Sequence, residues 1–291
     1  MTNPSAKSSL NFSVIIPTLN EERWLPKLLK DLKDQTLQNF EVIVVDGNSD
    51  DNTVKKAKQF SSFFSLKVID ADKRNVSYQR NLGVNQAKYN WLIFMDADNR
   101  LPNDFFEELN GELEKNSEID AFTCWLKVDA YPAIYKPFAR FLNFGFSLIG
   151  SEAMGALIGI KNELFKQFKF DENQQFAEDT DLIKRITEAR HSFKIFHNPR
   201  YVYSPRRADT EGIFKLASAS IEGRIKMLLN QPLEKFEKYP MLGGGYYCNK
   251  QGSRFVALMK EIDQQLSKAS AKQLNKAKRI WQAVIDEIVE E

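Results

Sequence analysis

Two aspartates, Asp96 and Asp98, directly follow the apolar run WLIFM at residues 91–95. Two carboxylates one residue apart repel each other unless a cation lies between them. Carboxylate oxygens suit Mg²⁺ and Mn²⁺, and such a bound ion keeps open positions for phosphate oxygens. The pair is therefore a candidate metal site. The competing interpretation is that Asp98 or Asn99 caps the helix that follows.

A second acidic group, Glu178 and Asp179, lies in the segment FAEDTDLIKRITEAR at residues 176–190. A carboxylate held beside a reacting hydroxyl can take its proton. The same acidic residues also favour the start of a helix, because the N-terminal end of a helix attracts negative charge. These residues are therefore candidates for a general base or for a structural helix start.

Arginine and histidine side chains form a third group of candidate site residues. The adjacent Arg206 and Arg207, in SPRR at residues 204–207, suit phosphate oxygens, and solvated surface arginines are the alternative. The chain has two histidines, His191 and His197. His197 is either a third metal ligand or a packed or edge histidine, and we favour the second interpretation.

The first half of the chain alternates short apolar runs with amphipathic segments. The runs are SVIIP (13–17), EVIVV (41–45), LKVI (66–69) and WLIFM (91–95). This alternation predicts a mainly parallel sheet flanked by helices, an α/β fold of Rossmann-like type. Each run ends in polar residues, and ligands bind at the carboxyl ends of such strands. We therefore expect the polar loops to form one rim.

The second half is less regular. Pro102 suits the first turn of a helix at about 102–115, and residues 119–128 and 153–160 are strand-like. A further helix presents one apolar face, made of Leu182, Ile183 and Ile186. Residues 1–11 are expected to be a disordered lead, and the region from residue 211 to 291 is expected to be mostly helical.

Composition excludes several classes of protein. The 291 residues are 43% hydrophobic, enough for a real core, and the net charge of +2 argues against a nucleic-acid-binding protein. The two cysteines have no disulfide or zinc spacing. No segment has the roughly 18 uninterrupted apolar residues of a membrane span, and the N-terminus does not resemble a signal peptide.

Four motifs in order resemble the family 2 glycosyltransferases. They are FSVIIPTLNEE, FEVIVVDGNSDDNT, QRNLGVNQAKYNWLIFMDADN and FAEDTDLIKR, and the resemblance covers about residues 12–190. It implies the A-type nucleotide-sugar transferase (GT-A) fold over residues 12–210, with a nucleotide-binding half at 12–100 and an acceptor half at 101–210. Residues 211–291 would be a helical C-terminal extension.

The resemblance also implies roles on the donor side. The nucleoside pocket and the base or ribose contacts would involve Pro17, Thr18, Asn20, Glu21, Asp46 and Asn48. Arg80 would lie near the donor phosphates or position the aspartates. Many members of the family carry a second aspartate where this chain has Gly47, so the choice of nucleoside stays open.

The resemblance assigns the reacting groups as well. Asp96 would contact the ribose or donor sugar, and Asp98 would bind the Mn²⁺ or Mg²⁺ that bridges the diphosphate. Asp179 would be the catalytic base, with Glu178 on the acceptor side. Asp96 and Asp98 would hold the metal, and Arg80, Arg206 and Arg207 would supply further positive charge.

We therefore expect a metal-dependent inverting enzyme that moves a sugar from a UDP- or GDP-type donor to an acceptor hydroxyl. The resemblance favours a cytoplasmic enzyme, or one peripheral to the inner membrane face, that makes cell-surface glycans or glycolipids. The alternatives are a nucleotidyltransferase, which would normally show a glycine-rich phosphate loop, and a catalytically silent sugar-nucleotide-binding scaffold.

The aromatic segment at residues 131–150, YPAIYKPFARFLNFGFSLIG, has apolar residues near one helical face beside Lys136 and Arg140. Such a pattern is typical of an interfacial membrane helix or of a lid over an apolar acceptor. A helix packed on the core or a homodimer surface explains it equally simply. We expect a lipid-linked acceptor, or one at a membrane surface.

Overall fold

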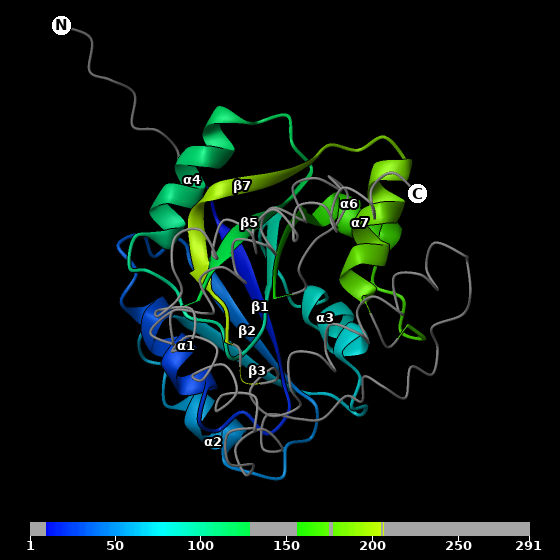
Figure 1. The fold of residues 1–291 in the computed structure, drawn as a ribbon. Helices are drawn as coiled ribbons and strands as arrows, with labels where there is room; N and C mark the ends of the chain where they lie inside the picture. Colours follow the sequence, from blue (N-terminus) through cyan, green and yellow to red (C-terminus); the bar gives the residue numbers. More distant parts are fainter. Residues whose placement is uncertain (1–9, 129–155, 175–176, 205, 207–291) are drawn as a thin grey trace, which may run out of the picture.

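The computed structural model describes residues 10–128, 156–174, 177–204 and 206 (Figure 1). Most of the expected disordered lead lies outside these residues. So do Arg207, the aromatic segment at 131–150 and the expected helical extension at 211–291.

One sheet of seven strands forms the centre of the molecule, in the order β3-β2-β1-β4-β6-β5-β7. The strands are β1 (Phe12–Thr18), β2 (Phe40–Asp46), β3 (Ser65–Asp70), β4 (Trp91–Met95), β5 (Ala121–Lys127), β6 (Leu157–Lys161) and β7 (Phe193–Val202). The first four are parallel to one another, β6 runs antiparallel to both its neighbours, and β5 and β7 are parallel. The expectation of a mainly parallel sheet is confirmed.

Helices cover both faces of the sheet (Figure 1). The helices are α1 (Leu25–Lys33), α2 (Thr53–Lys58), α3 (Val76–Val84), α4 (Phe105–Lys115), α6 (Asn162–Phe168) and α7 (Glu178–Glu188). Successive residues of β1 enter different cores. Val14 and Ile16 pack with residues of α1 and α4, and Ile15 packs with residues of α6 and α7. Strands covered on both faces are apolar throughout, which explains the continuous runs in the sequence.

The apolar face predicted for residues 182–186 is confirmed, because Leu182, Ile183 and Ile186 are fully buried in α7. The helix expected at about 102–115 begins later, at Phe105. Pro102 lies in the turn before it, where its carbonyl accepts a hydrogen bond from the Phe105 backbone N–H at 3.2 Å.

Helix α3 lies unusually close to the sheet. A Cβ atom at Gly83 would lie 2.6 Å from Cγ2 of Ile15 in β1, so only glycine allows this approach without a shift. The same helix carries Gln79 and Arg80, which are 4% and 2% exposed. Close packing of α3 thus places a guanidinium beneath the ends of the strands.

The loop after β4 is fixed by α1 and by β7. Asp31 of α1 accepts hydrogen bonds from Nη2 of Arg100 at 2.6 Å and from the backbone N–H of Leu101 at 3.1 Å. The backbone of Arg100 also pairs with Val202 in both directions, at 3.0 and 2.8 Å. These contacts bring the end of β7 beside Asp96 and Asp98.

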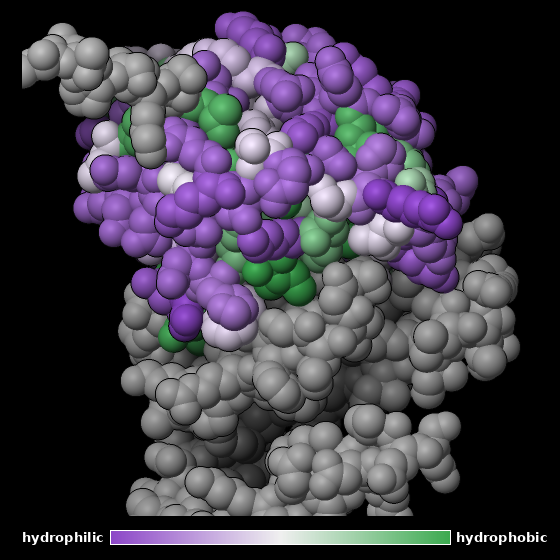
Figure 2. All heavy atoms as spheres, turned by 90° about the horizontal axis from the view of Figure 1, so that it is seen from above, coloured by the Kyte–Doolittle hydropathy of each residue, from purple (hydrophilic) through white to green (hydrophobic). Residues whose placement is uncertain are grey.

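The described surface is largely polar. Figure 2 shows one face, on which hydrophilic residues predominate and hydrophobic ones form small separate groups. Phe63 is the large apolar side chain that is exposed within the described ranges. No helix in those ranges has the length and apolarity that crossing a membrane requires. Cys124 is buried, as expected of a packed thiol.

Candidate active site

Arg80 bridges two acidic segments that lie far apart in the sequence. Its Nη2 lies 3.1 Å from Oδ1 of Asp96, and its Nη1 lies 2.8 Å from Oε1 of Glu178. Of the two roles inferred for Arg80, this geometry favours positioning the aspartates, because the side chain is only 2% exposed.

Arg206 makes a second bridge. Nη1 and Nη2 lie 2.8 and 2.5 Å from the two carboxylate oxygens of Glu21, and Nε lies 2.8 Å from Oδ2 of Asp98. The fork of an arginine fits a carboxylate in this bidentate way. Among the described residues, the cations that contact Asp96 and Asp98 are thus Arg80 and Arg206.

Carboxyl groups outnumber guanidiniums among the described residues of this region. We define the acidic cluster as Glu21, Asp96, Asp98, Glu178 and Asp179, which share Arg80 and Arg206. Burial raises the pKa of Glu21 to about 7, against the opposing effect of Arg206. Partial burial of the side chain, which is 38% exposed, and the charges of Asp98 and Glu178 raise the pKa of Asp96 to about 6, while Arg80 opposes the shift. When these carboxyl groups are ionised, the two described guanidiniums do not fully neutralise them, so a further cation would be favoured here.

Asp179 lies in the first turn of α7, after Ala177 in a left-handed conformation (φ 54°). Burial and the neighbouring Glu178 raise the pKa of Asp179 to about 7, while Arg80 and backbone hydrogen bonds oppose the shift. A carboxylate with a pKa near neutrality is suited to accept a proton at physiological pH. The surroundings of Asp179 therefore match those expected of a general base.

The acidic cluster fits a hard divalent cation in chemical type. Asp96 and Asp98 offer carboxylate oxygens, and 38% of the Asp96 side chain is exposed. Among the described residues, however, no set of three acidic, histidine or cysteine side chains is already arranged around a common ion position. His197 lies on the edge strand β7 and stacks on Trp125, with ring centroids 3.9 Å apart. Mg²⁺ and Mn²⁺ commonly complete their shells with water and phosphate oxygens, so two protein carboxylates are sufficient.

Donor-side residues at the ends of β1 and β2 are joined to one another by hydrogen bonds. The Asp46 carboxylate accepts bonds from the hydroxyls of Thr18 at 2.9 Å and Ser49 at 2.6 Å and from the Ser49 backbone N–H at 2.7 Å. Asn20 and Asn48 both have positive φ, 55° and 62°. Pro17 is buried within β1. The structure places these residues at adjacent strand ends but does not bring Asp46 into the acidic cluster.

Gly47 has a structural partner that the sequence did not suggest. A Cβ atom there would lie 3.2 Å from the side-chain amide of Gln79. That amide donates hydrogen bonds to the carbonyls of Thr18 at 2.9 Å and Val45 at 2.7 Å. An aspartate at position 47 would therefore require Gln79 to shift.

Sequence reasoning missed two aromatic residues beside the cluster. The Trp24 ring lies 5.6 Å from the Arg206 guanidinium carbon and 4.0 Å from Nζ of Lys27. Tyr201 is fully buried in β7, and its hydroxyl has no hydrogen-bond partner within the described part of the chain. The position of Trp24, three residues after Glu21, was an available signal, whereas nothing around Tyr201 in the sequence marks it.

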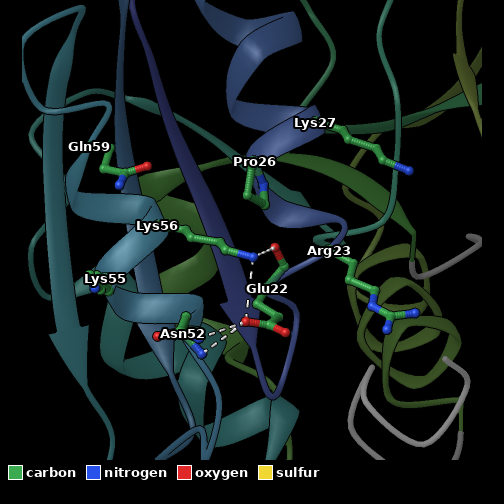
Figure 3. Close-up of a pocket in the computed structure, with 8 residues that line it drawn as sticks. All are labelled: Glu22, Arg23, Pro26, Lys27, Asn52, Lys55, Lys56 and Gln59. Carbon is green, nitrogen blue, oxygen red and sulfur yellow. Dashed lines mark hydrogen bonds and ion pairs between the residues drawn. The ribbon is translucent and has the colours of Figure 1, made fainter. Parts of the chain in front are cut away.

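A basic hollow lies next to this site, between the start of α1 and α2 (Figure 3). In it, Lys56 and Asn52 both contact the Glu22 carboxylate, at 3.4 and 3.0 Å. Figure 3 shows Arg23 and Lys27 pointing away from α2, so the cations of this hollow do not converge on one point.

The sequence and the fold also match known proteins. Residues 13–175 match the model of glycosyl transferase family 2. The minor teichoic acid biosynthesis protein GgaB of Bacillus subtilis (strain 168) is 27% identical in an alignment over 243 residues that covers 78% of this chain and 26% of that protein. The glycosyltransferase GlyA of Streptococcus pneumoniae serotype 4 is 27% identical in an alignment over 252 residues that covers 77% of this chain and 36% of that protein. The chain thus spans about a quarter to a third of the length of these relatives.

Solved structures show the same fold. The mannosyltransferase PcManGT from Pyrobaculum calidifontis, in complex with GDP-Man and Mn²⁺, aligns with a TM-score of 0.62 at 17% identity, over 95% of this chain and 84% of that chain. TarS 1–349 of S. aureus, in complex with UDP-GlcNAc, aligns with a TM-score of 0.55 at 21% identity, over 67% of this chain and 58% of that chain. At this identity the likeness shows the fold, which is of the GT-A type. The match over more than half of the chain, on this fold, shows that the chain belongs to glycosyl transferase family 2.

Proposed function

We propose that this chain transfers a sugar from a nucleoside-diphosphate sugar to an acceptor hydroxyl, with inversion at the anomeric carbon. The observation that carries the proposal is the surroundings of Asp179. This buried carboxylate has its pKa raised to about 7 beside a cluster of acids and arginines. The complexes of two structural neighbours, with UDP-GlcNAc and with GDP-Man and Mn²⁺, support a donor of the UDP- or GDP-sugar class.

In the proposed reaction Asp179 takes the proton of the acceptor hydroxyl. The acceptor oxygen forms a bond to the anomeric carbon from the side opposite the leaving diphosphate, while the bond between that carbon and the diphosphate oxygen breaks. The bonding electrons leave with the diphosphate. A single displacement with one base produces inversion. Glu178, fixed by Arg80, would border the acceptor, and it would help to keep Asp179 from ionising below neutral pH.

Asp96 and Asp98 would hold Mn²⁺ or Mg²⁺ on the donor side. When bound, the ion would neutralise the charge that develops on the leaving diphosphate. Arg206, already beside Asp98, would add a further cation, together with Arg207. Asp96 would contact the ribose or the donor sugar. Pro17, Thr18, Asn20, Glu21, Asp46 and Asn48 would border the nucleoside.

Donor turnover with and without Mn²⁺ tests this proposal. We expect release of nucleoside diphosphate from one UDP- or GDP-sugar, and this release should depend on Mn²⁺. Asp98→Ala should abolish both the release and the metal-dependent binding of the donor. The matched control is Asp171→Ala, an exposed aspartate before α7, which should behave like the wild type. Binding without turnover for every donor and acceptor would instead indicate a silent sugar-nucleotide-binding protein. Turnover that persists in Asp98→Ala would contradict the metal assignment.

We also propose that the acceptor is lipid-linked or lies at a membrane surface, with residues 131–150 making the peripheral contact. The support is the amphipathic sequence of this segment and the teichoic acid biosynthesis for which the relative from Bacillus subtilis is named. Sedimentation with liposomes should recover the wild type in the pellet more than a variant carrying Phe138→Asp and Phe141→Asp. Equal recovery of both in the supernatant would rule the contact out and leave the lid, a helix packed on the core or the homodimer surface.

A further inference from the structure

Arg206 occupies one of the two carboxylates to which we assign the metal. Its Nε lies 2.8 Å from Oδ2 of Asp98, and the two side chains are only 14% and 15% exposed. A divalent cation on Asp98 would therefore be placed next to a guanidinium that water screens poorly. Like charges at this separation oppose each other, so Arg206 and the metal compete for Asp98.

Arg206 is also anchored independently of Asp98. Two of its nitrogens bind both oxygens of Glu21, whose side chain is 8% exposed. Breaking that pair would leave a buried carboxylate without its partner, which is costly. The favourable response to a metal is therefore for the guanidinium to give up Asp98 and keep Glu21. The Trp24 ring, 5.6 Å from the guanidinium carbon, limits where the side chain can go.

We infer that Arg206 makes metal binding conditional on the nucleoside diphosphate. Metal alone would bring a divalent charge beside a retained guanidinium, whereas a diphosphate between them would neutralise both. Each ligand would then strengthen the binding of the other by the same factor, because coupling between two binding equilibria is reciprocal. This inference rests on the metal assignment of the proposed function. It makes Arg206 the residue that couples metal binding to donor binding, an effect that we call the gate.

Mn²⁺ binding, measured by calorimetry with and without nucleoside diphosphate, tests the inference without any assay of turnover. We expect the wild type to bind Mn²⁺ weakly alone. Arg206→Gln should bind Mn²⁺ alone about tenfold more tightly, and its coupling to UDP or GDP should shrink by a similar factor. Arg206→Lys keeps the positive charge and should bind Mn²⁺ alone as weakly as the wild type.

Two further variants isolate the effect of the Arg206 charge. Arg206→Gln also releases Glu21, a carboxylate that can itself bind a metal, so the double variant Arg206→Gln with Glu21→Gln removes that carboxylate. We expect the double variant still to bind Mn²⁺ alone more tightly than the wild type. Arg200→Gln, a second arginine near the end of β7 that lies against Trp125, is the matched control and should keep wild-type affinity and coupling.

The outcomes separate the inference from the proposed function. If Mn²⁺ affinity and coupling are the same in the wild type, Arg206→Gln and the double variant, the gate is wrong while the metal assignment stands. If the gain appears in Arg206→Gln but not in the double variant, Glu21 is the cause and the gate is also wrong. If no variant binds Mn²⁺ even with nucleoside diphosphate, the metal assignment fails and the gate fails with it.

Discussion

Opposing effects set the pKa of Asp179. Burial and Glu178 disfavour its ionised form, whereas Arg80 and the backbone of the first turn of α7 favour it. The balance leaves a pKa of about 7, so the residue can gain and lose a proton near neutral pH. A solvated carboxylate would be too weak a base for this purpose. The buried first turn of α7 is thus what distinguishes Asp179 from the exposed acids of the chain.

Asp179→Asn should separate binding from chemistry. The amide has nearly the same shape but cannot accept the acceptor's proton, so donor affinity should stay close to that of the wild type. Turnover should fall by about 10²–10⁴-fold. Calorimetry with nucleoside diphosphate and a product assay measure the two quantities. An Asp179→Asn variant with wild-type turnover would show that another residue is the base.

The pH profile gives an independent check of the same residue. Because the pKa of Asp179 is raised, the base is protonated and inactive below about 7 and ionised above it. We therefore expect kcat/KM to rise with pH through about 7 and then to level. The pKa values of Glu21 and Asp96 are also raised, so the residual activity of Asp179→Asn is the necessary comparison. The rise near pH 7 should be absent from that residual activity.

Among single residues, the sequence pointed to Asp96 and Asp98 because two carboxylates one residue apart follow an apolar strand, and to Asp179 through the resemblance of FAEDTDLIKR to the family 2 glycosyltransferases. It could not indicate which arginine meets which acid. The contact between Arg206 and Glu21 joins residues 185 positions apart, and it depends on the pairing of β7 with the loop after β4. Contacts between residues so far apart produce no local pattern in the amino-acid sequence.

Among the secondary-structure elements, α3 is the helix that positions the site. It packs close to β1 through Gly83 and carries both Gln79 and Arg80 on its buried side. A bulkier residue at position 83 would push α3 away from the sheet and shift Arg80 from Asp96 and Glu178. The stability of the fold and the geometry of the acidic cluster are therefore linked through one glycine.

Two glycine substitutions test that link. Gly83→Ala should lower the free energy of unfolding by about 1–3 kcal/mol, because the new Cβ overlaps Ile15. Gly111→Ala, in α4, meets no atom within 4 Å and should raise it by about 0.5–1 kcal/mol through helix propensity. Urea denaturation measures both. Equal effects of the two substitutions would show that α3 can move away from β1 at no cost.

The sequence predicted the first four strands to within one residue at each end. Three of them, β1, β2 and β4, are buried along their whole length, and buried parallel strands are largely apolar, whereas the edge strand β3 is only partly buried. It did not indicate that β6 inserts between β4 and β5 in the opposite direction. The same apolar residues suit a parallel or an antiparallel strand, because side chains alternate between the two faces of the sheet in both. Direction is set by how the connecting segments cross the sheet, and that is a property of the assembled fold.

Taken together, the described residues form one mixed sheet between two helical layers, with the acidic cluster beside the ends of β4 and β7. The near-neutral net charge leaves anion binding to local groups such as Arg80 and Arg206. The curated relatives are about three to four times as long as the matching region. The proposed function therefore concerns this chain alone and rests on the surroundings of Asp179.

Metal-dependent donor binding is tested most directly by a thermal unfolding screen with UDP, GDP and their sugars, each with and without Mn²⁺. A ligand that binds only the folded state raises the melting temperature by mass action. We predict that one nucleoside class raises the melting temperature only when Mn²⁺ is present, and that Asp98→Ala abolishes the rise. An unchanged melting temperature with every nucleotide, with and without Mn²⁺, would contradict the proposed function.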